Sequence, residues 1–235
     1  MSDTALHIPN GIIGIPTSLG FGLAAVLAVA ACVAAARRGL DDRLVPLAGL
    51  ATAFIFAAQM LNFPIAAGVS GHLVGGALAA ALLGPWLGVL CLTVVVAVQA
   101  LLFADGGVTA LGLNIVNMAV ISTVAAWAVI ALALKVLPRT RAGLTAAVFA
   151  GSVVSVVAAS AGFLLQFALG GEPIGQSFAA IAAALLGTHV LIGVGEAAIS
   201  AAAVTAVALT RPDLVHALNG GRLDQPGDGL AKETA

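Results

Sequence analysis

The sequence predicts an all-α, polytopic membrane helix bundle with about seven transmembrane helices, its N-terminus outside and its C-terminus inside. Composition is the first observation: of 235 residues, 61% are hydrophobic and only 8% are charged, against about 25% charged residues in a soluble domain. The second observation is that charged residues separate apolar runs long enough to cross a hydrocarbon core about 30 Å thick. The nine Lys and Arg form no basic block, which excludes a nucleic-acid-binding surface.

The apolar runs define seven predicted spans. Pro46 opens the second span, because proline suits the first turn of a helix. In the last apolar run, 177–209, we expect a short outer helical piece followed by one crossing. The predicted spans are residues 18–36, 46–61, 72–83, 85–103, 110–135, 143–169 and 188–209.

The apolar run 71–103 has to be divided between two of these spans. As one helix it would measure about 50 Å at 1.5 Å per residue, which is too long for a single crossing. Gly84-Pro85 is the expected break. The short helix before it cannot cross alone, so we expect residues 65–70 to enter the membrane as irregular chain, which is tolerated only where protein or a polar cavity covers it.

The distribution of Lys and Arg sets the predicted orientation, because cytoplasmic loops carry an excess of basic residues. We therefore predict a single transmembrane domain at 1–210 and a short polar cytoplasmic tail at 211–235. The predicted inner segments hold all nine basic residues: Arg37, Arg38, Arg43, Lys135, Arg139, Arg141, Arg211, Arg222 and Lys232.

Two histidines lie on the predicted outer side. His7 precedes the first span, and His72 begins the short third helix. Either one alone could simply hydrogen-bond a loop carbonyl, but the pair favours a metal site. We expect His72 to stay neutral and free to bind a metal, because the dipole at a helix N-terminus opposes protonation.

A few more polar residues need an explanation. Glu196 is the only carboxylate within the predicted spans, where ionisable groups are costly and usually functional. His189 lies two turns before it on the same face. Both could instead join helices by hydrogen bonds, and the same holds for Asn114 and Asn117, which share one helix face. His216, in the predicted tail, is expected to be solvated.

Several ordered motifs, spaced from His7 to about Leu209, resemble those of the CbiM/NikM family. This family comprises the substrate-capture membrane components of energy-coupling-factor transporters for cobalt and nickel. The motifs are His7-Ile8-Pro9-Asn10-Gly11, Met60-Leu61-Asn62-Phe63-Pro64, Ser70-Gly71-His72-Leu73-Val74-Gly75-Gly76, Leu83-Gly84-Pro85-Trp86, Gln99-Ala100-Leu101-Leu102-Phe103-Ala104-Asp105-Gly106-Gly107, Leu111-Gly112-Leu113-Asn114-Ile115-Val116-Asn117-Met118 and His189-Val190-Leu191-Ile192-Gly193-Val194-Gly195-Glu196.

The resemblance implies a seven-helix bundle whose N-terminus reaches into the fold from outside. It also implies a metal held by nitrogen donors: the terminal amine, the amide and imidazole of the next residue, a histidine, and a second histidine near the third helix. The two imidazoles correspond to His7 and His72. Planar nitrogen sites suit Ni²⁺, and Co²⁺ can also accept them. The metal is then Co²⁺ or Ni²⁺ as transported substrate, and no permanently bound cofactor is expected.

The resemblance further implies a transporter subunit in the cytoplasmic (inner) cell membrane and not an enzyme. Such a subunit works with a transmembrane coupling subunit and two ATPase subunits that hydrolyse ATP. In some systems a small accessory membrane protein joins them.

The sequence departs from the family pattern at its start. In the family the histidine follows the initiating methionine, whereas here Met1-Ser2-Asp3-Thr4-Ala5-Leu6 precede His7. Bacterial leucine codons UUG and CUG can serve as start codons. We therefore hypothesise that translation starts at the Leu6 codon, which would make the backbone nitrogen of residue 6 a free amine and a metal ligand. In the longer chain, water or another side chain would complete the site at lower affinity.

The residues also allow two other classes of protein. A rhomboid-type intramembrane serine protease would use Ser70, in Gly68-Val69-Ser70-Gly71 at the head of a short helix, with His189 as its base. Ala197 stands where that family has a second glycine. A standalone secondary ion transporter would use Glu196, but it would need inverted repeats and more ionisable groups at mid-membrane.

Overall fold

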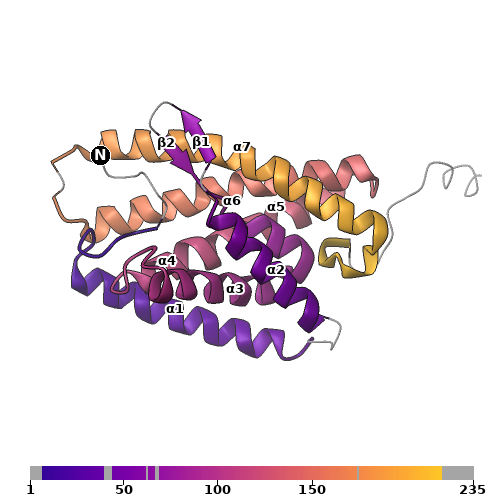
Figure 1. The fold of residues 1–235 in the computed structure, drawn as a ribbon, viewed down its shortest axis with the longest axis horizontal. Helices are drawn as coiled ribbons and strands as arrows, with labels where there is room; N and C mark the ends of the chain where they lie inside the picture. The colour runs from indigo at the N-terminus through magenta and orange to yellow at the C-terminus, as the bar shows by residue number, and fades with distance from the viewer. Residues whose placement is uncertain (1–6, 40–43, 62, 67–68, 174, 219–235) are drawn as a thin grey trace, which may run out of the picture.

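A bundle of apolar helices makes up nearly all of the computed structural model, which describes residues 7–39, 44–61, 63–66, 69–173 and 175–218 (Figure 1). Within these residues, five helical stretches are long and apolar enough to cross a membrane, and one apolar helix is shorter. This confirms the predicted all-α membrane bundle. The long stretches are α1 (Ile15–Ala36), α3 (Gly76–Leu102), α4 (Leu111–Asn114) continued by the π-helix η1 (Ile115–Ile121) and α5 (Ser122–Val136), α6 (Arg141–Gly170) and α7 (Phe178–Thr210), and the shorter helix is α2 (Leu44–Gln59).

The predicted break at Gly84-Pro85 is confirmed. Gly84 has φ +78° and ψ 172° inside α3, a backbone conformation that favours glycine. The chain turns back on itself there, because a Cβ added to Gly88 would lie 3.1 Å from the carbonyl carbon of Ala79. The eight residues before Gly84 are all buried, so the first half of α3 lies inside the bundle. The number of membrane crossings stays a prediction.

The chain between α2 and α3 differs from the expectation. Residues 65–70 were expected to be irregular, but β1 (Phe63–Ala66) and β2 (Val69–Gly71) form an antiparallel hairpin. Pairing the strands satisfies backbone groups that irregular chain would leave without partners. Helix α3 begins at Gly76, so His72 lies in non-helical chain before the helix and not at its first residue.

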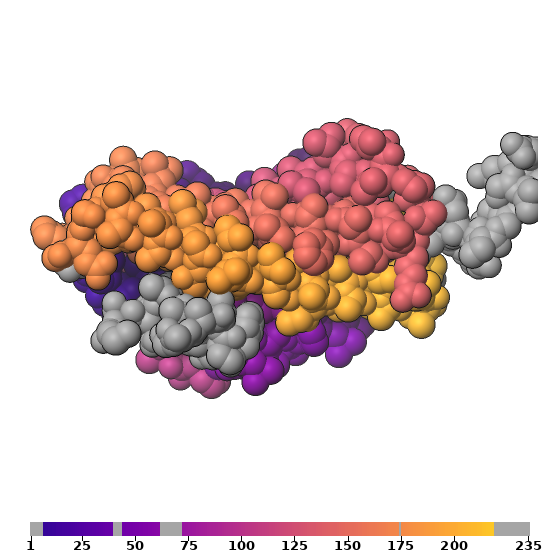
Figure 2. All heavy atoms as spheres, turned by 90° about the horizontal axis from the view of Figure 1, so that it is seen from above, coloured from indigo at the N-terminus to yellow at the C-terminus, as the bar shows by residue number. Residues whose placement is uncertain are grey.

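Helix α7 is continuous, so the predicted division of its apolar run into two pieces is wrong. Its 33 residues correspond to about 50 Å at 1.5 Å per residue. The helix runs through both glycines: a Cβ added at Gly187 would meet no atom within 4 Å, and Gly193 packs closely on Val153 of α6. Figure 2 shows α7, orange to yellow, lying along the surface of the molecule over most of its length.

Basic residues gather at one end of the bundle. In Figure 1, α1 ends, α2 begins, α6 begins and α7 ends towards the right. This is the grouping that the positive-inside rule expects of the inner end; the outside location of the N-terminus stays a prediction. The basic residues of the described chain at these helix ends, or between the end of α5 and the start of α6, are Arg37, Arg38, Lys135, Arg139, Arg141 and Arg211.

The chain after α7 folds back onto α3 through two short 3₁₀ helices, η2 (Pro212–Leu214) and η3 (His216–Leu218). Val215 and Leu218 are each only 1% exposed and belong to the main apolar core. His216 is exposed, as expected, and one side of its ring lies against Gly84 and 5.1 Å from the ring of Trp127. The first part of the predicted tail therefore closes this end of the bundle, while 219–235 lie outside the described residues.

Candidate metal centre

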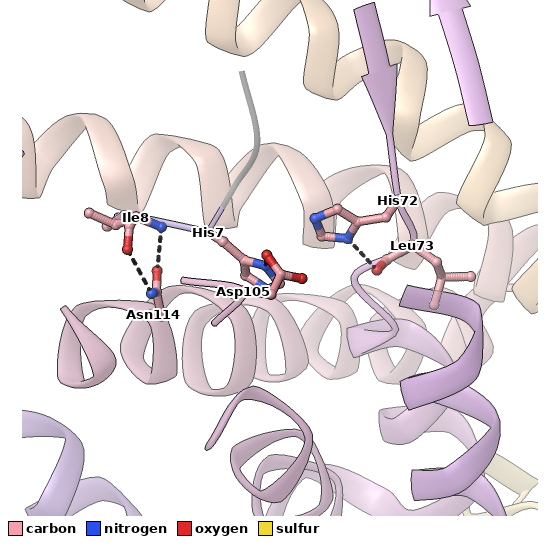
Figure 3. Close-up of polar contacts among 6 residues, drawn as sticks. All are labelled: His7, Ile8, His72, Leu73, Asp105 and Asn114. Atoms are coloured by element: carbon pink, nitrogen blue, oxygen red, sulfur yellow. Dashed lines mark hydrogen bonds and ion pairs between the residues drawn. The ribbon is translucent and has the colours of Figure 1, made fainter. Parts of the chain in front are cut away.

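The segment before α1 is held in the bundle by α4 and by the loop that precedes it (Figure 3). The backbone N–H of Ile8 donates to Asn114 Oδ1 at 2.8 Å, and Asn114 Nδ2 donates back to the Ile8 carbonyl at 3.2 Å. Gly107 N–H donates to the same carbonyl at 2.9 Å. Asn10 Oδ1 accepts from both the backbone N–H and the hydroxyl of Thr109. These bonds fix the position of the preceding residue, His7.

His7 is buried beside an acidic residue that the sequence analysis did not select. Its Nδ1 lies 2.7 Å from Asp105 Oδ1. The hydrogen bond from His7 holds the pKa of Asp105 below its usual range. An ionised carboxylate can only accept, so Nδ1 carries the hydrogen. In the neutral ring Nε2 is then unprotonated, and this buried atom has no hydrogen-bond partner among the described residues. A histidine oriented in this way is typical of metal sites.

His72 presents the same arrangement. Its Nδ1 donates to the carbonyl of Leu73 at 3.0 Å, which leaves Nε2 as the acceptor nitrogen. Burial, aided by the neighbouring His7, lowers the pKa of His72 to about 4. His72 is therefore neutral at pH 7, as expected. The physical reason is burial, because His72 does not lie at the helix N-terminus.

The structure brings the two predicted histidines together. Their rings are stacked, with centroids 4.9 Å apart and planes inclined by 29° (Figure 3). Among the described residues, no group of three or more His, Cys, Asp and Glu side chains could hold a metal ion. Side chains of these four types in the described part of the chain therefore do not complete a site by themselves. Leu6, the other predicted donor, lies outside the described residues.

Glu196 holds the backbone that follows His72. The Glu196 carboxylate is fully buried on α7, and its two oxygens accept from Val74 N–H at 2.6 Å and from Gly75 N–H at 3.1 Å. From the other side, Gln59 at the end of α2 donates through Nε2 to the Val74 carbonyl at 2.7 Å. Glu196 and Gln59 therefore hold the non-helical chain between β2 and α3 from two sides.

The remaining predicted polar residues make structural contacts. Asn117 donates through Nδ2 to Gln166 Oε1 of α6 at 2.7 Å, which is an interhelical hydrogen bond. His189 donates through Nδ1 to the Leu185 carbonyl of its own helix at 2.7 Å. It still lies close enough to His72 to disfavour protonation of that ring.

The protease alternative required Ser70 at the head of a helix. Ser70 instead lies in β2, where its backbone pairs with Pro64 of β1, and the next helix begins only at Gly76. This part of the hypothesis is wrong. The residues that sequence reasoning missed, Asp105 and Gln59, gave only weak signals: Asp105 was the single acidic residue in a motif noted for its family resemblance.

A family model described as the cobalt uptake substrate-specific transmembrane region, CbiM, matches residues 7–214. The chain belongs to the CbiM family. The match begins at His7 and includes both histidines of the candidate centre. The described residues of this CbiM chain form several apolar helices, so it is a multi-pass membrane protein.

Known proteins similar to this CbiM chain are transport proteins. A cobalt transport protein CbiM of Sorangium cellulosum is 31% identical over 224 residues, covering 93% of this chain and 98% of the relative. A fused nickel transport protein NikMN of Rhodobacter capsulatus is 39% identical over 127 residues, covering 54% of this chain and 37% of the relative. A crystal structure of a truncated transition metal transporter superposes with a TM-score of 0.74 at 29% identity, covering 87% of this chain and 98% of that chain.

Proposed function

We propose that this protein is the metal-capturing membrane subunit of an energy-coupling-factor transporter that imports Co²⁺ or Ni²⁺. The observation that carries the proposal is the stacked, buried pair of His7 and His72. Each ring has its Nδ1 in a hydrogen bond, so each has Nε2 left to coordinate a metal. Imidazole nitrogens suit late first-row divalent ions better than they suit Mg²⁺ or Ca²⁺.

The donor atom of His7 depends on where the chain begins. A six-membered chelate ring through the backbone amide of His7 needs Nδ1, which here is bonded to Asp105. In the chain that includes residues 1–5, we propose Nε2 as the donor, with Asp105 orienting the ring. In a chain that starts at residue 6, the free amine would complete the chelate, and the ring would turn to present Nδ1.

The same proposal assigns partners and a location. A transmembrane coupling subunit and two ATPase subunits would supply the energy, with a small accessory membrane protein in some systems, and the complex would lie in the cytoplasmic membrane. Large apolar side chains on the outer faces of α1 and α7 are suited to lipid or to a coupling subunit. They include Leu19, Leu23 and Val26 of α1 and Leu191, Val194 and Ile199 of α7. Copurification of the coupling and ATPase subunits with this chain from its host tests the assignment.

Metal binding by the purified protein tests the central claim. His72→Ala is expected to abolish tight binding of Ni²⁺ and Co²⁺, because one of two buried imidazole donors is lost. Ser70→Ala is the matched control and is expected to bind like the wild type. Metal-independent proteolysis that disappears in Ser70→Ala, with no metal binding by the wild type, would overturn the proposal.

A further inference from the structure

We infer that Glu196 and Gln59 are positioning residues for the metal site: together they fix the Val74–Gly75 backbone and thereby set the place of the His72 imidazole. The inference rests on the proposed function, since it concerns the same site. It gives a role to the buried carboxylate of α7, which the coordination of a metal by two histidines leaves unexplained.

The contacts approach the His72 segment from two helices. Glu196 is 0% exposed and Gln59 1% exposed. Glu196 accepts from the N–H groups of Val74 and Gly75, while Gln59 donates to the carbonyl of Val74. Both polar groups of the Val74 backbone are thus satisfied by side chains of α7 and α2. The segment lies between β2 and α3 and takes part in neither, so loss of one partner would leave a buried backbone group unsatisfied.

The backbone at Gly75 is also packed closely against α2. Gly75 has φ +87°, and a Cβ at this position would lie 2.7 Å from Cγ2 of Ile55 on α2. The backbone of residue 75 is therefore pressed against α2 in a conformation that glycine alone adopts readily. The two hydrogen bonds to Glu196 and the contact of Gly75 with Ile55 fix the backbone only three residues after His72.

The position of the carboxylate explains how it is tolerated inside an apolar bundle. The N–H groups that it accepts lie immediately before Gly76, the first residue of α3. The N-terminus of a helix carries partial positive charge, which stabilises an anion there. Both oxygens accept backbone hydrogen bonds from the segment that follows His72, so we assign Glu196 a supporting role.

The affinity of the full-length protein for Ni²⁺, measured by competition with a chromophoric chelator, tests the inference together with the absorption spectrum of the bound ion. Glu196→Gln keeps the shape of the side chain but places an NH₂ group against a backbone N–H. We expect Ni²⁺ to bind about 10- to 100-fold more weakly, the usual effect of losing an outer-shell support, and the spectrum to change as His72 shifts. Ser200→Ala is the matched control, because this buried hydroxyl lies about one turn further along α7 and has no hydrogen-bond partner among the described residues.

A double-mutant cycle separates positioning from a general effect on folding. In a His72→Ala background, Glu196→Gln is expected to change the residual Ni²⁺ affinity by less than about twofold, because its effect passes through His72. Gln59→Leu, which removes only the donor to the Val74 carbonyl, is expected to weaken binding up to about tenfold and provides the test if Glu196→Gln is not recovered folded.

Two results would overturn the inference: wild-type affinity and spectrum in Glu196→Gln, or an equal loss of affinity with and without His72. Failure of the proposed function looks different. In that case the wild type itself binds neither Ni²⁺ nor Co²⁺, whereas failure of the positioning role leaves the wild type binding and His72→Ala deficient.

Discussion

Asp105→Asn is expected to weaken metal binding about tenfold, because the carboxylate both orients His7 and attracts the cation. Asp105 Oδ1 lies 2.7 Å from His7 Nδ1, on the opposite side of the ring from the free Nε2. Asparagine can still accept the hydrogen bond through its oxygen, so the substitution mainly removes the charge.

The magnitude follows from Coulomb's law. Across an imidazole ring, a divalent ion about 6 Å from a carboxylate is attracted by about 5 kcal/mol at an effective dielectric constant of about 20 and by about 1.4 kcal/mol in water. The Asp105 side chain is 36% exposed, so solvent screening favours the lower figure. A loss of about 1.4 kcal/mol corresponds to a tenfold rise in Kd.

Isothermal titration of the purified protein with Ni²⁺ at low and high salt would measure this effect, which is expected to shrink at high salt. Asp213→Asn is the control, since it makes the same change in net charge beyond the end of α7. Unchanged affinity in Asp105→Asn would refute the electrostatic argument. Tighter binding would show that Asp105 competes with the metal for Nδ1, and hence that Nε2 is not the donor.

Three further predictions concern topology, pH and the N-terminus. In a background without native cysteines, a cysteine in the 37–43 loop is expected to be protected from membrane-impermeant reagents in whole cells and one beside Glu172 to be labelled; the opposite pattern would reverse the orientation. The folded-state pKa of His72 is lowered to about 4, whereas the ordinary value is about 6.5, so between these pH values protons bind mainly to the unfolded chain. The apparent Tm in detergent is therefore expected to fall as pH drops from about 6.5 to about 4. A Tm that is flat over this interval would contradict the burial of a neutral ring. A chain shortened to start with methionine at position 6, in place of Leu6, is expected to bind Ni²⁺ more tightly than the chain with residues 1–5, because an amine binds a metal without the deprotonation that an amide needs. N-terminal mass spectrometry of the protein from its native host shows which form the cell makes. A dominant peptide starting at residue 1 or 2 would refute the alternative start.

The helices were predictable from the sequence because a membrane-spanning helix needs an apolar run of a certain length, and charged residues separate these runs. The break at Gly84-Pro85 followed from an apolar run too long for one crossing and a proline at its middle. The continuity of α7 could not be predicted in the same way, because Gly187 and Gly193 are tolerated inside a helix that packs on α6. The hairpin at 63–71 gave no signal either, since its short strands include a proline and no clear alternation.

The site was predictable only in part, because the sequence does not show which distant side chains contact the two histidines. Family motifs selected His7 and His72, and the structure brings their rings together. Spacing along the chain contains no information on which distant side chain will lie behind each histidine. Asp105 and Gln59 became meaningful only when the fold placed them against His7 and the Val74 backbone.

Most of the buried polar residues around this centre serve the backbone, and this follows from where the histidines lie. Both are in non-helical chain inside an apolar bundle, where unpaired N–H and C=O groups are costly. Asn114 satisfies the backbone of Ile8, and Glu196 with Gln59 satisfies that of Val74. Non-helical chain has no helical hydrogen bonds, so side chains provide the partners of these backbone groups. The two imidazoles are then held by bonds at or beside Nδ1, which leaves Nε2 of each ring as the nitrogen available to a metal.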